Sequence, residues 1–531
     1  MAVSKSLSKG GRVEVSANEY DVLVVGAGLA GLTVASLLAR GEGKRVAVLE
    51  REDFIGGRLL SFTGEGDHLL LQGKKLDVEG FRKALRAVYT WVGRSNPDLE
   101  TIMKKGLLDG YTFEAGGHAT FWGTKGRVAH LLSYIGKEID LPGNQGFAVI
   151  DPASKALYPV QRGGAYGWMD EESNHITKEL LREMALADEE KLKEWDTISF
   201  GKWLKDRTDN RKVYEYLAAI ASIHMVMGEP DMIPAGDFIR FMTTAVKIGM
   251  NLVQGSTGIV PRPGFIRIAE LIAETVEEGG GKILTGHEVK EVLVEDGRVT
   301  GARVAGPGGE ETFGCRQLVC TVPVRKIWGF IPRSLFPGDF VRKVEERFFS
   351  VGMLTGYMGL NRNVLEEAGI NPKSWLLAPA IIKSEEGYIG DVDIISIMPS
   401  SFTPTLAPPD KHTLAFSIAL TEGELHDRKK VDRVIDASVQ LFEEVFPSLS
   451  QCREWEIWTC SDKGFGDWPP PGEKRPDVVC PYVQGLYFSG DGYGEKTWGS
   501  GMDAAVLSAL LCVDAMCGSR YTEEVLPEYH R

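Results

Sequence analysis

The chain has few cysteines and no segment long and apolar enough to cross a membrane. Its seven cysteines include no CxxC pair and stand mostly in apolar runs such as ALLCVDAMC. Such residues are typical of buried free thiols, so we expect a reducing, cytoplasmic compartment and no structural zinc. No stretch reaches the ~18 uninterrupted apolar residues that a spanning helix needs. Peripheral contact with a membrane surface stays open.

Basic residues are not in excess either. Lys and Arg number 60 against 74 Asp and Glu, for a formal net charge of −14. This balance argues against nucleic acid as the partner, because phosphate binding needs clustered cations. The nine histidines lack metal-ligand spacing such as HxxxH, so we expect no metal. Residues 1–18 lack the apolar core of a signal peptide and are expected to form a flexible tail.

Glycine, in contrast, is concentrated where an apolar run ends, in DVLVVGAGLAGL. The run predicts a buried parallel strand, and the residues after the glycines predict a helix. In the GxGxxG pattern, Gly26 permits the tight turn, Gly28 lets the backbone approach a pyrophosphate, and Gly31 lets helix and strand pack closely. The helix begins at Leu29 and Ala30, so its N-terminal dipole faces the same anion.

The next strand, RVAVLE, ends at Glu50, where a carboxylate can accept hydrogen bonds from the adenosine ribose. Arg51 follows, and the pattern continues as E-x-x-x-x-x-G-G-R, ending on Gly57 and Arg58. This continuation resembles the flavin-binding segment of the flavin amine oxidase and phytoene desaturase superfamily. The resemblance implies that the segment wraps FAD rather than a nicotinamide nucleotide, with Arg58 near the pyrophosphate.

Two middle segments carry the resemblance further. GYTFEAGGHAT is similar to the family's strand and turn beside the flavin, which implies that Gly116 and Gly117 pass close to the ring and that His118 lies at its edge. A helix and a single strand, KILTGHEVKEVLVE, are similar to the return of the chain to the flavin domain. There Val289 falls where the family uses backbone groups to bind adenine.

The C-terminal segment completes the pattern. The strand GLYFSGD ends in Gly490 and Asp491, and in the family an acid at this point binds ribityl or pyrophosphate oxygens. The helix that follows contains Gly501, Met502 and Ala505, and the resemblance implies that its N-terminus points at the flavin pyrimidine ring.

The resemblance implies an α/β fold with a discontinuous Rossmann-like FAD-binding domain and a mixed β-sheet and helical substrate domain. We assign the FAD-binding domain to residues 19–122, 256–325 and 481–520, with an inserted helical segment at 64–108. The substrate domain takes residues 123–255 and 326–480.

Within the insertion, FRKALRAVYTWV places Phe81, Leu85, Val88 and Val92 on one face of a predicted helix, with basic residues nearby. Such a helix can lie on a membrane surface, form a homodimer contact, or pack on its own domain.

The sequence also departs from the family pattern. Met353 stands where amine oxidases usually keep a lysine near the flavin, and Gly501 replaces the aromatic residue that often helps to cage an amine. Both changes favour an apolar substrate, with Met353, Tyr493 and Trp498 as candidate lining residues, although the last two can equally be packing residues. Cys460 lies roughly where certain amine oxidases carry a flavin-bonded cysteine, but we expect non-covalent FAD.

We therefore predict an FAD-dependent oxidoreductase that desaturates, saturates or isomerises carbon–carbon bonds in an apolar, isoprenoid- or polyene-like substrate by hydride transfer at flavin N5. His118 is the candidate acid or base. No second dinucleotide fingerprint occurs, so the electron acceptor or donor is left unassigned. The alternatives are an oxidase of amines or of a porphyrinogen-like ring and, in another class, a non-catalytic prenyl-lipid carrier of the same fold.

Overall fold

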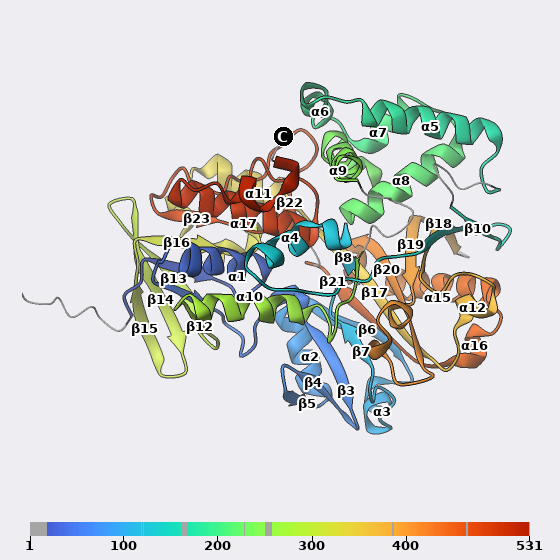
Figure 1. Ribbon diagram of the computed structural model, residues 1–531, viewed down its shortest axis with the longest axis horizontal. Helices are drawn as coiled ribbons and strands as arrows, with labels where there is room; N and C mark the ends of the chain where they lie inside the picture. The colour runs from blue at the N-terminus through green and yellow to red at the C-terminus, as the bar shows by residue number, and fades with distance from the viewer. Residues whose placement is uncertain are drawn as a thin grey trace, which may run out of the picture.

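The structure is a computed structural model, which describes residues 18–117, 119–120, 122–160, 167–227, 229–249, 258–384, 387–463 and 466–529. The expected flexible tail, apart from Asn18, lies outside the described residues, and so does His118. Two halves lie side by side, one built on a parallel sheet and the other on a larger mixed sheet (Figure 1).

The first half is built on a five-stranded sheet in which all neighbouring strands are parallel. β1 and β2 are fully buried runs of apolar, mostly β-branched residues, as expected for a parallel sheet covered on both faces. The strands, in sheet order, are β12 (Lys282–Leu284), β2 (Val46–Leu49), β1 (Val22–Val25), β16 (Gln317–Cys320) and β23 (Leu486–Phe488).

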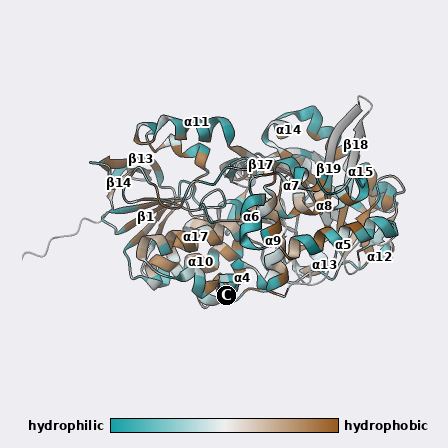
Figure 2. Cartoon of the chain, turned by 90° about the horizontal axis from the view of Figure 1, so that it is seen from above, coloured by the Kyte–Doolittle hydropathy of each residue, from teal (hydrophilic) through white to brown (hydrophobic). Residues whose placement is uncertain are grey.

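Three helices cover one face of this sheet, α1 (Leu29–Ser36), α10 (Ile266–Glu278) and α17 (Gly501–Cys517) (Figure 1). A three-stranded meander covers the other face, so that Leu23 and Val25 share a core with Val292. Strand β1 and helix α17 are hydrophobic, whereas the outer helices α11 (Gly338–Arg347) and α14 (Glu422–His426) are largely hydrophilic (Figure 2). The meander consists of β13 (Glu288–Glu295), β14 (Arg298–Gly306) and β15 (Gly309–Gly314).

The second half is built on a nine-stranded sheet whose centre is antiparallel. Its central strands, in sheet order, are β18 (Ser374–Ser384), β19 (Gly387–Ile397), β20 (His412–Thr421), β17 (Phe349–Leu360) and β21 (Arg453–Ser461). At the two sides lie β10 (Leu157–Pro159) with β9 (Gly146–Ile150), and β6 (Thr90–Asn96), while β22 (Asp467–Trp468) pairs with one end of β17.

Helices pack on both faces of this large sheet. α8 (Arg211–Met225) contacts β18 and β19 on one side, and α15 (Arg428–Val445) contacts the same strands on the other. The layer that contains α8 also holds α5 (Glu171–Ala185), α6 (Glu189–Trp195), α7 (Phe200–Lys205) and α9 (Ala235–Lys247) (Figure 1). It forms the helical part of the expected substrate domain.

The segment at 64–108 differs from the expected helical insertion, because strands make up much of it. β4 (His68–Leu71) and β5 (Lys74–Leu76) join β3 (Ser61–Glu65) and β7 (Thr112–Glu114) in a separate four-stranded sheet. β6 crosses over and pairs with β21, so it belongs to the sheet of the other half. α2 (Val78–Ala87) and α3 (Leu99–Lys104) are its only α-helices within the described chain.

The expected amphipathic helix is also shorter than predicted. α2 ends at Ala87, and Val92 lies in β6 instead. Phe81 and Leu85 are fully buried, and the Phe81 ring lies 4.9 Å from that of Phe62. The apolar face of α2 therefore packs into its own domain, the third of the roles expected for it. Among the described residues, no helix has both the length and the apolarity needed to span a membrane.

A second difference concerns KILTGHEVKEVLVE, which we expected to form a single strand. It forms two, β12 in the parallel sheet and β13 in the meander. Between them Gly286 adopts a φ of +67°, and the Gly286 amide donates to the Glu52 carbonyl. This bend brings His287 against the end of β2, where its amide donates to the Glu50 carbonyl.

Glu114 in β7 ties three elements together inside the protein. Its carboxylate accepts a hydrogen bond of 2.5 Å from the Ser61 hydroxyl and one of 3.4 Å from the Phe265 amide at the start of α10. Burial raises the pKa of this carboxyl from 4.5 to about 8, against the lowering effect of these hydrogen bonds. Because the folded pKa exceeds the unfolded one, Glu114 favours the folded state most at low pH, and this contribution is lost as the pH rises toward 8.

Replacing Glu114 with Gln should therefore flatten the pH dependence of stability. We expect the free energy of unfolding of the wild type to fall relative to Glu114→Gln by up to ~1.4 kcal/mol per pH unit between about pH 5 and 8. Urea unfolding of both proteins across this range measures the difference. If the free energy of unfolding had the same pH dependence in both proteins, a neutral, buried Glu114 would be contradicted.

Candidate functional site

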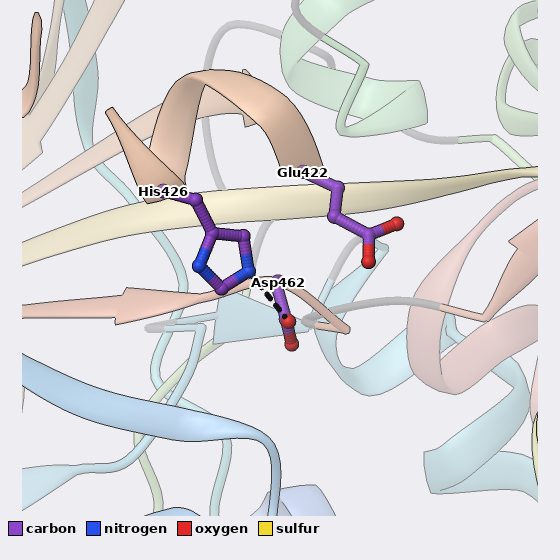
Figure 3. A group of neighbouring side chains, drawn as sticks. All are labelled: Glu422, His426 and Asp462. Carbon is purple, nitrogen blue, oxygen red and sulfur yellow. Dashed lines mark hydrogen bonds and ion pairs between the residues drawn. The ribbon is translucent and has the colours of Figure 1, made fainter.

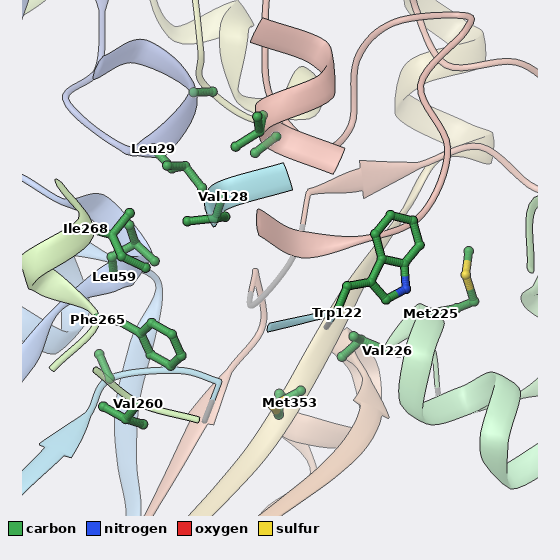
Figure 4. Close-up of a cluster of buried hydrophobic side chains, with 14 of the residues drawn as sticks. Leu29, Leu59, Trp122, Val128, Met225, Val226, Val260, Phe265, Ile268 and Met353 are labelled. Carbon is green, nitrogen blue, oxygen red and sulfur yellow. The ribbon is translucent and has the colours of Figure 1, made fainter. Parts of the chain in front are cut away.

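One large cavity runs between the two halves, with a volume of about 720 Å³. It extends from the ends of β1 and β2 past the glycine turns to the face of the large sheet. In Figure 4, Leu29 and Leu59 from the first half and Met353 and Val226 from the second belong to one hydrophobic cluster around it.

The GxGxxG turn gives each glycine a separate role. Gly26 has a φ of +103°, a conformation that favours glycine. A Cβ on Gly31 would lie 2.0 Å from the Gly26 carbonyl oxygen, so this glycine allows α1 to pack directly on β1. A Cβ on Gly28 would meet no protein atom within 4 Å, and Gly28 lines the cavity. Gly31 therefore serves packing, while Gly28 keeps space clear beside the helix N-terminus.

Glu50 lies at the end of β2, as the spacing predicted, and lines the cavity. Its carboxylate accepts hydrogen bonds from the amides of Ala27 (2.8 Å) and Glu52 (3.0 Å). Burial raises its pKa, while these two amides act in the opposite direction. The carboxyl therefore fixes the first turn to the end of β2 and also faces the cavity.

Arg58 and Asp491 form an ion pair across the cavity wall, although they lie 433 residues apart in the chain. The distance from Arg58 Nη2 to Asp491 Oδ1 is 3.1 Å, and the Gly466 amide donates to Asp491 Oδ2 at 2.8 Å. Asp491 is buried, whereas the Arg58 side chain is 36% exposed. An N-terminal and a C-terminal segment of the chain thus meet at the residues expected to bind the pyrophosphate and ribityl groups.

Most of the remaining residues expected at the cofactor lie in the same lining. These are Leu29, Ala30, Arg51, Gly57, Gly116, Gly117, Val289, Gly490, Gly501, Met502 and Ala505. They come from six separate stretches of the chain, which the fold brings together around one cavity. The role expected for His118 stays a prediction, because this residue lies outside the described chain.

Asp503 lies in the first turn of α17 and also lines the cavity. Its carboxylate accepts a 2.9 Å hydrogen bond from the Arg127 amide. Burial raises the pKa of Asp503 to about 7, in opposition to the charge of the Arg127 guanidinium. A group that ionises near neutral pH therefore stands in the cavity wall at the start of this helix.

The other end of the cavity lies against the large sheet. Met353 on β17, Ala419 on β20 and Ile395 on β19 line it, and so do residues at the end of α8. The lining is mainly apolar, but it includes the carboxyl of Asp393 and the hydroxyl of Ser417.

Tyr493 and Trp498 do not belong to this lining, which favours packing, the second of the two roles expected for them. The Tyr493 hydroxyl donates to the Val322 carbonyl at 2.6 Å, and its ring stacks on Phe488. The Arg127 guanidinium lies 3.9 Å from the centre of the Trp498 ring. Both aromatic residues are buried packing groups.

Cys460 is also placed away from the cavity. It lies on β21 in the core cluster on the α15 side of the large sheet, whereas the next residue, Ser461, lines the cavity. Burial raises the pKa of the Cys460 thiol to about 12. A buried, neutral thiol on the opposite face of a strand is not positioned to attack a cofactor in the cavity.

Several cavity residues could not be identified from the sequence. Tyr89 and Lys326 line the end near Glu50, where the Tyr89 ring lies 5.6 Å from the Arg51 guanidinium carbon and 6.0 Å from the Lys326 amine. Tyr89 follows the end of α2, with a φ of +60°. Asp393 could have been identified from the sequence, because an acidic residue interrupts the apolar strand DVDIISI.

Away from the cavity, one group of side chains has the composition of a metal site. Within the described residues, Glu422, His426 and Asp462 place their ligand atoms within 4.8 Å of one another (Figure 3). Glu422 already pairs with Arg325 at 2.7 Å and with Lys463 at 3.2 Å. These two cations balance the carboxylate and would repel an added cation.

The parallel sheet, the glycine turn and the cavity beside it are those of a dinucleotide-binding protein. The model of the family described as flavin containing amine oxidoreductase matches residues 29–517, and the chain belongs to this family. The match confirms the resemblance seen in the sequence, and the cofactor is FAD.

Individual relatives are distant. The phytoene desaturase (neurosporene-forming) of Cereibacter sphaeroides is 26% identical over 298 residues, covering 53% of this chain and 49% of that enzyme. The chloroplastic prolycopene isomerase of Arabidopsis thaliana is 22% identical over 93% of this chain and 82% of its own. Among solved structures, the cyclohexylamine oxidase of Brevibacterium oxydans superposes with a TM-score of 0.57 at 14% identity, covering 96% of this chain and 100% of that one.

The described residues fit FAD. The space beside Gly28 and the N-terminus of α1 suit the pyrophosphate, and Glu50 can accept hydrogen bonds from the adenosine ribose. Arg58 and Asp491 lie at the junction of the two halves, where the flavin end of the cofactor would continue toward α17. The N-terminus of α17 supplies a dipole that favours negative charge in this part of the cavity.

Two glycine variants should separate packing from cofactor binding. In Gly31→Ala the new methyl group meets the Gly26 carbonyl, so we expect the FAD-free protein to lose ~1–3 kcal/mol of stability. In Gly28→Ala no protein atom is met, so we expect unchanged stability without FAD but weaker FAD binding, by tenfold or more. Chemical unfolding of the FAD-free proteins and fluorescence titration with FAD measure the two effects. Equal loss of stability in both variants would contradict these roles.

Asp503 should make flavin reduction depend on pH. Ionisation above pH 7 adds a negative charge to the cavity wall, which opposes the gain of electrons. An effect of ~1–2 kcal/mol corresponds to roughly 30 mV for a two-electron couple. We expect the reduction potential of the wild type to fall below that of Asp503→Asn by about this amount between pH 6 and 8. Spectroelectrochemical titration measures it, and an offset independent of pH would rule out this titration.

Proposed function

We propose that this protein is an FAD-dependent oxidoreductase that acts on carbon–carbon bonds of an apolar, isoprenoid- or polyene-like substrate. The observation that carries the proposal is Met353, which lies on β17 in the cavity wall where amine oxidases usually keep a lysine. An apolar side chain there cannot hold a water molecule or exchange a proton, but it can pack against a hydrocarbon.

The surrounding lining supports the same proposal. Ile223 on α8 and Val226 directly after it line the chamber together with Ile395 and Trp375 from the sheet. These residues would bind an extended apolar molecule and keep water out, so that binding energy comes from burial of hydrocarbon. Two distant relatives also bear names of enzymes that desaturate or isomerise polyenes.

FAD, when bound, accepts or returns a hydride, and the protein contributes position and electrostatics. The wall formed by β17, β19 and β20 would fix the substrate against the cofactor. The start of α17 would stabilise negative charge that builds up on the cofactor when it gains electrons. His118 is our candidate for the group that donates or accepts the proton, as in the sequence analysis.

A second candidate is oxidation of an amine, and one observation favours it. Asp393 places a carboxyl in the chamber wall, and a carboxylate can bind an ammonium group. The non-catalytic carrier is a weaker alternative, because the space beside Gly28 and the Arg58–Asp491 pair suit a bound dinucleotide.

The purified protein should be yellow, and its visible flavin absorbance should bleach on reduction. Under anaerobic conditions, incubation with a panel of polyenes should change the number or geometry of their double bonds, as measured by chromatography and mass spectrometry. Release of hydrogen peroxide with amines and no change in any polyene would support the oxidase instead. A colourless protein that does not bind added FAD would contradict both enzymes.

A further inference from the structure

One carboxyl stands apart in the chamber wall. Among the described lining residues on β17 to β20, Asp393 is the ionisable one, and its companions are Met353, Trp375, Ile395, Ser417 and Ala419. The other charged groups of the cavity lie toward the nucleotide, at Glu50 and Arg58, or at the start of α17. Asp393 is therefore the charged group of the sheet wall itself.

Strand register places Asp393 in a defined row. Met353 on β17 pairs with Ala419 on β20 and with Ser461 on β21. On β19, Ile394 pairs with Ile418, so the register continued by one residue sets Asp393 beside Ala419. Asp393, Ala419, Met353 and Ser461 all line the cavity, and they form one row across four adjacent strands.

This row fixes a spacing. Neighbouring strands lie ~4.8 Å apart, so the backbone of Asp393 is about 10 Å from that of Met353, with Ala419 between them. Ala419 is too small to separate the two side chains. A bound molecule that covers Met353 can therefore reach Asp393 with its other end.

A purely hydrocarbon substrate would be poorly matched to this wall. Covering a carboxyl with hydrocarbon leaves every acceptor position that the protein does not fill without a hydrogen bond, which is costly. A substrate with an N–H or O–H group can donate to such a position. Asp393 already has an interaction within the protein, but a carboxylate offers about four acceptor positions and can take a further donor.

We propose that Asp393 selects substrates that are apolar over most of their length but carry a hydroxyl or amino group about 10 Å from the part that covers Met353. This inference rests on the proposed function and narrows its substrate class. Asp393 is a specificity-determining residue of the chamber, and unsubstituted hydrocarbons are disfavoured ligands.

The test uses the FAD-loaded protein and three probes with the same chain, 1-decylamine, 1-decanol and decyl methyl ether. The ether can accept a hydrogen bond but cannot donate one. Binding is followed by the change in the flavin spectrum and by the shift in thermal unfolding, neither of which requires turnover. Wild type, Asp393→Asn, Asp393→Leu and the neighbouring control Ser417→Ala are compared.

We expect the wild type to bind the amine or the alcohol at least tenfold more tightly than the ether. Preference for the amine over the alcohol identifies a cationic group, and equal affinity identifies the donor alone. In Asp393→Leu the preference over the ether should disappear while the ether binds at least as well. Asp393→Asn should lose any preference for the amine over the alcohol, and Ser417→Ala should keep the wild-type order.

Equal affinity of the wild type for all three probes would overturn the proposal, as would an unchanged preference in Asp393→Leu. If the Leu variant does not fold, the nearly isosteric Asn variant and the wild-type order still decide the question. A protein that binds no FAD would contradict the proposed function. A yellow protein that binds the amine and the alcohol no more tightly than the ether would contradict only this inference.

Discussion

The close approach of α1 to β1 is the constraint on which the cofactor site depends. It is possible only because Gly31 has no side chain, since a Cβ there would lie 2.0 Å from the Gly26 carbonyl oxygen. The approach aims the first amides of α1 at the space beside Gly28 and lets Glu50 bind the turn through the Ala27 amide. The direction in which the helix dipole points follows from this packing.

The rest of the site is assembled by long-range contacts on this frame. Arg58 forms an ion pair with Asp491. Glu114 binds the start of α10 to β7, the strand that precedes Gly116 and Gly117. Because both halves supply lining residues, neither half can complete the cavity alone. The parallel sheet supplies the nucleotide end, and the large sheet supplies the chamber wall.

Local patterns with strict steric requirements were predictable. The glycine turn, the acid at Glu50 and the family-like segments around Gly116 and Asp491 lead to the parallel sheet and to most of the cavity lining. Buried strands such as FSVGMLTGYMGL and HTLAFSIAL were recognisable from their apolar composition, and they form β17 and β20.

Features that depend on tertiary pairing could not be predicted. The bend at Gly286 divides one apparent strand between two sheets, and β6 leaves its local neighbourhood to pair with β21. Trp498 and Tyr493 are aromatic residues of the kind that can line a pocket. In the structure Trp498 packs against Arg127, and Tyr493 packs against Phe488. The row that joins Asp393 to Met353 depends on strand register, which their separation in the sequence does not reveal.

Hydrogen exchange with and without FAD tests most directly whether distant segments converge on one cofactor. Binding should slow exchange of the amides after Gly28, around Gly116 and at the start of α17 together, with similar dependence on FAD concentration. Protection confined to the segment after Gly28 would contradict a cofactor that reaches from the glycine turn to the flavin end of the cavity.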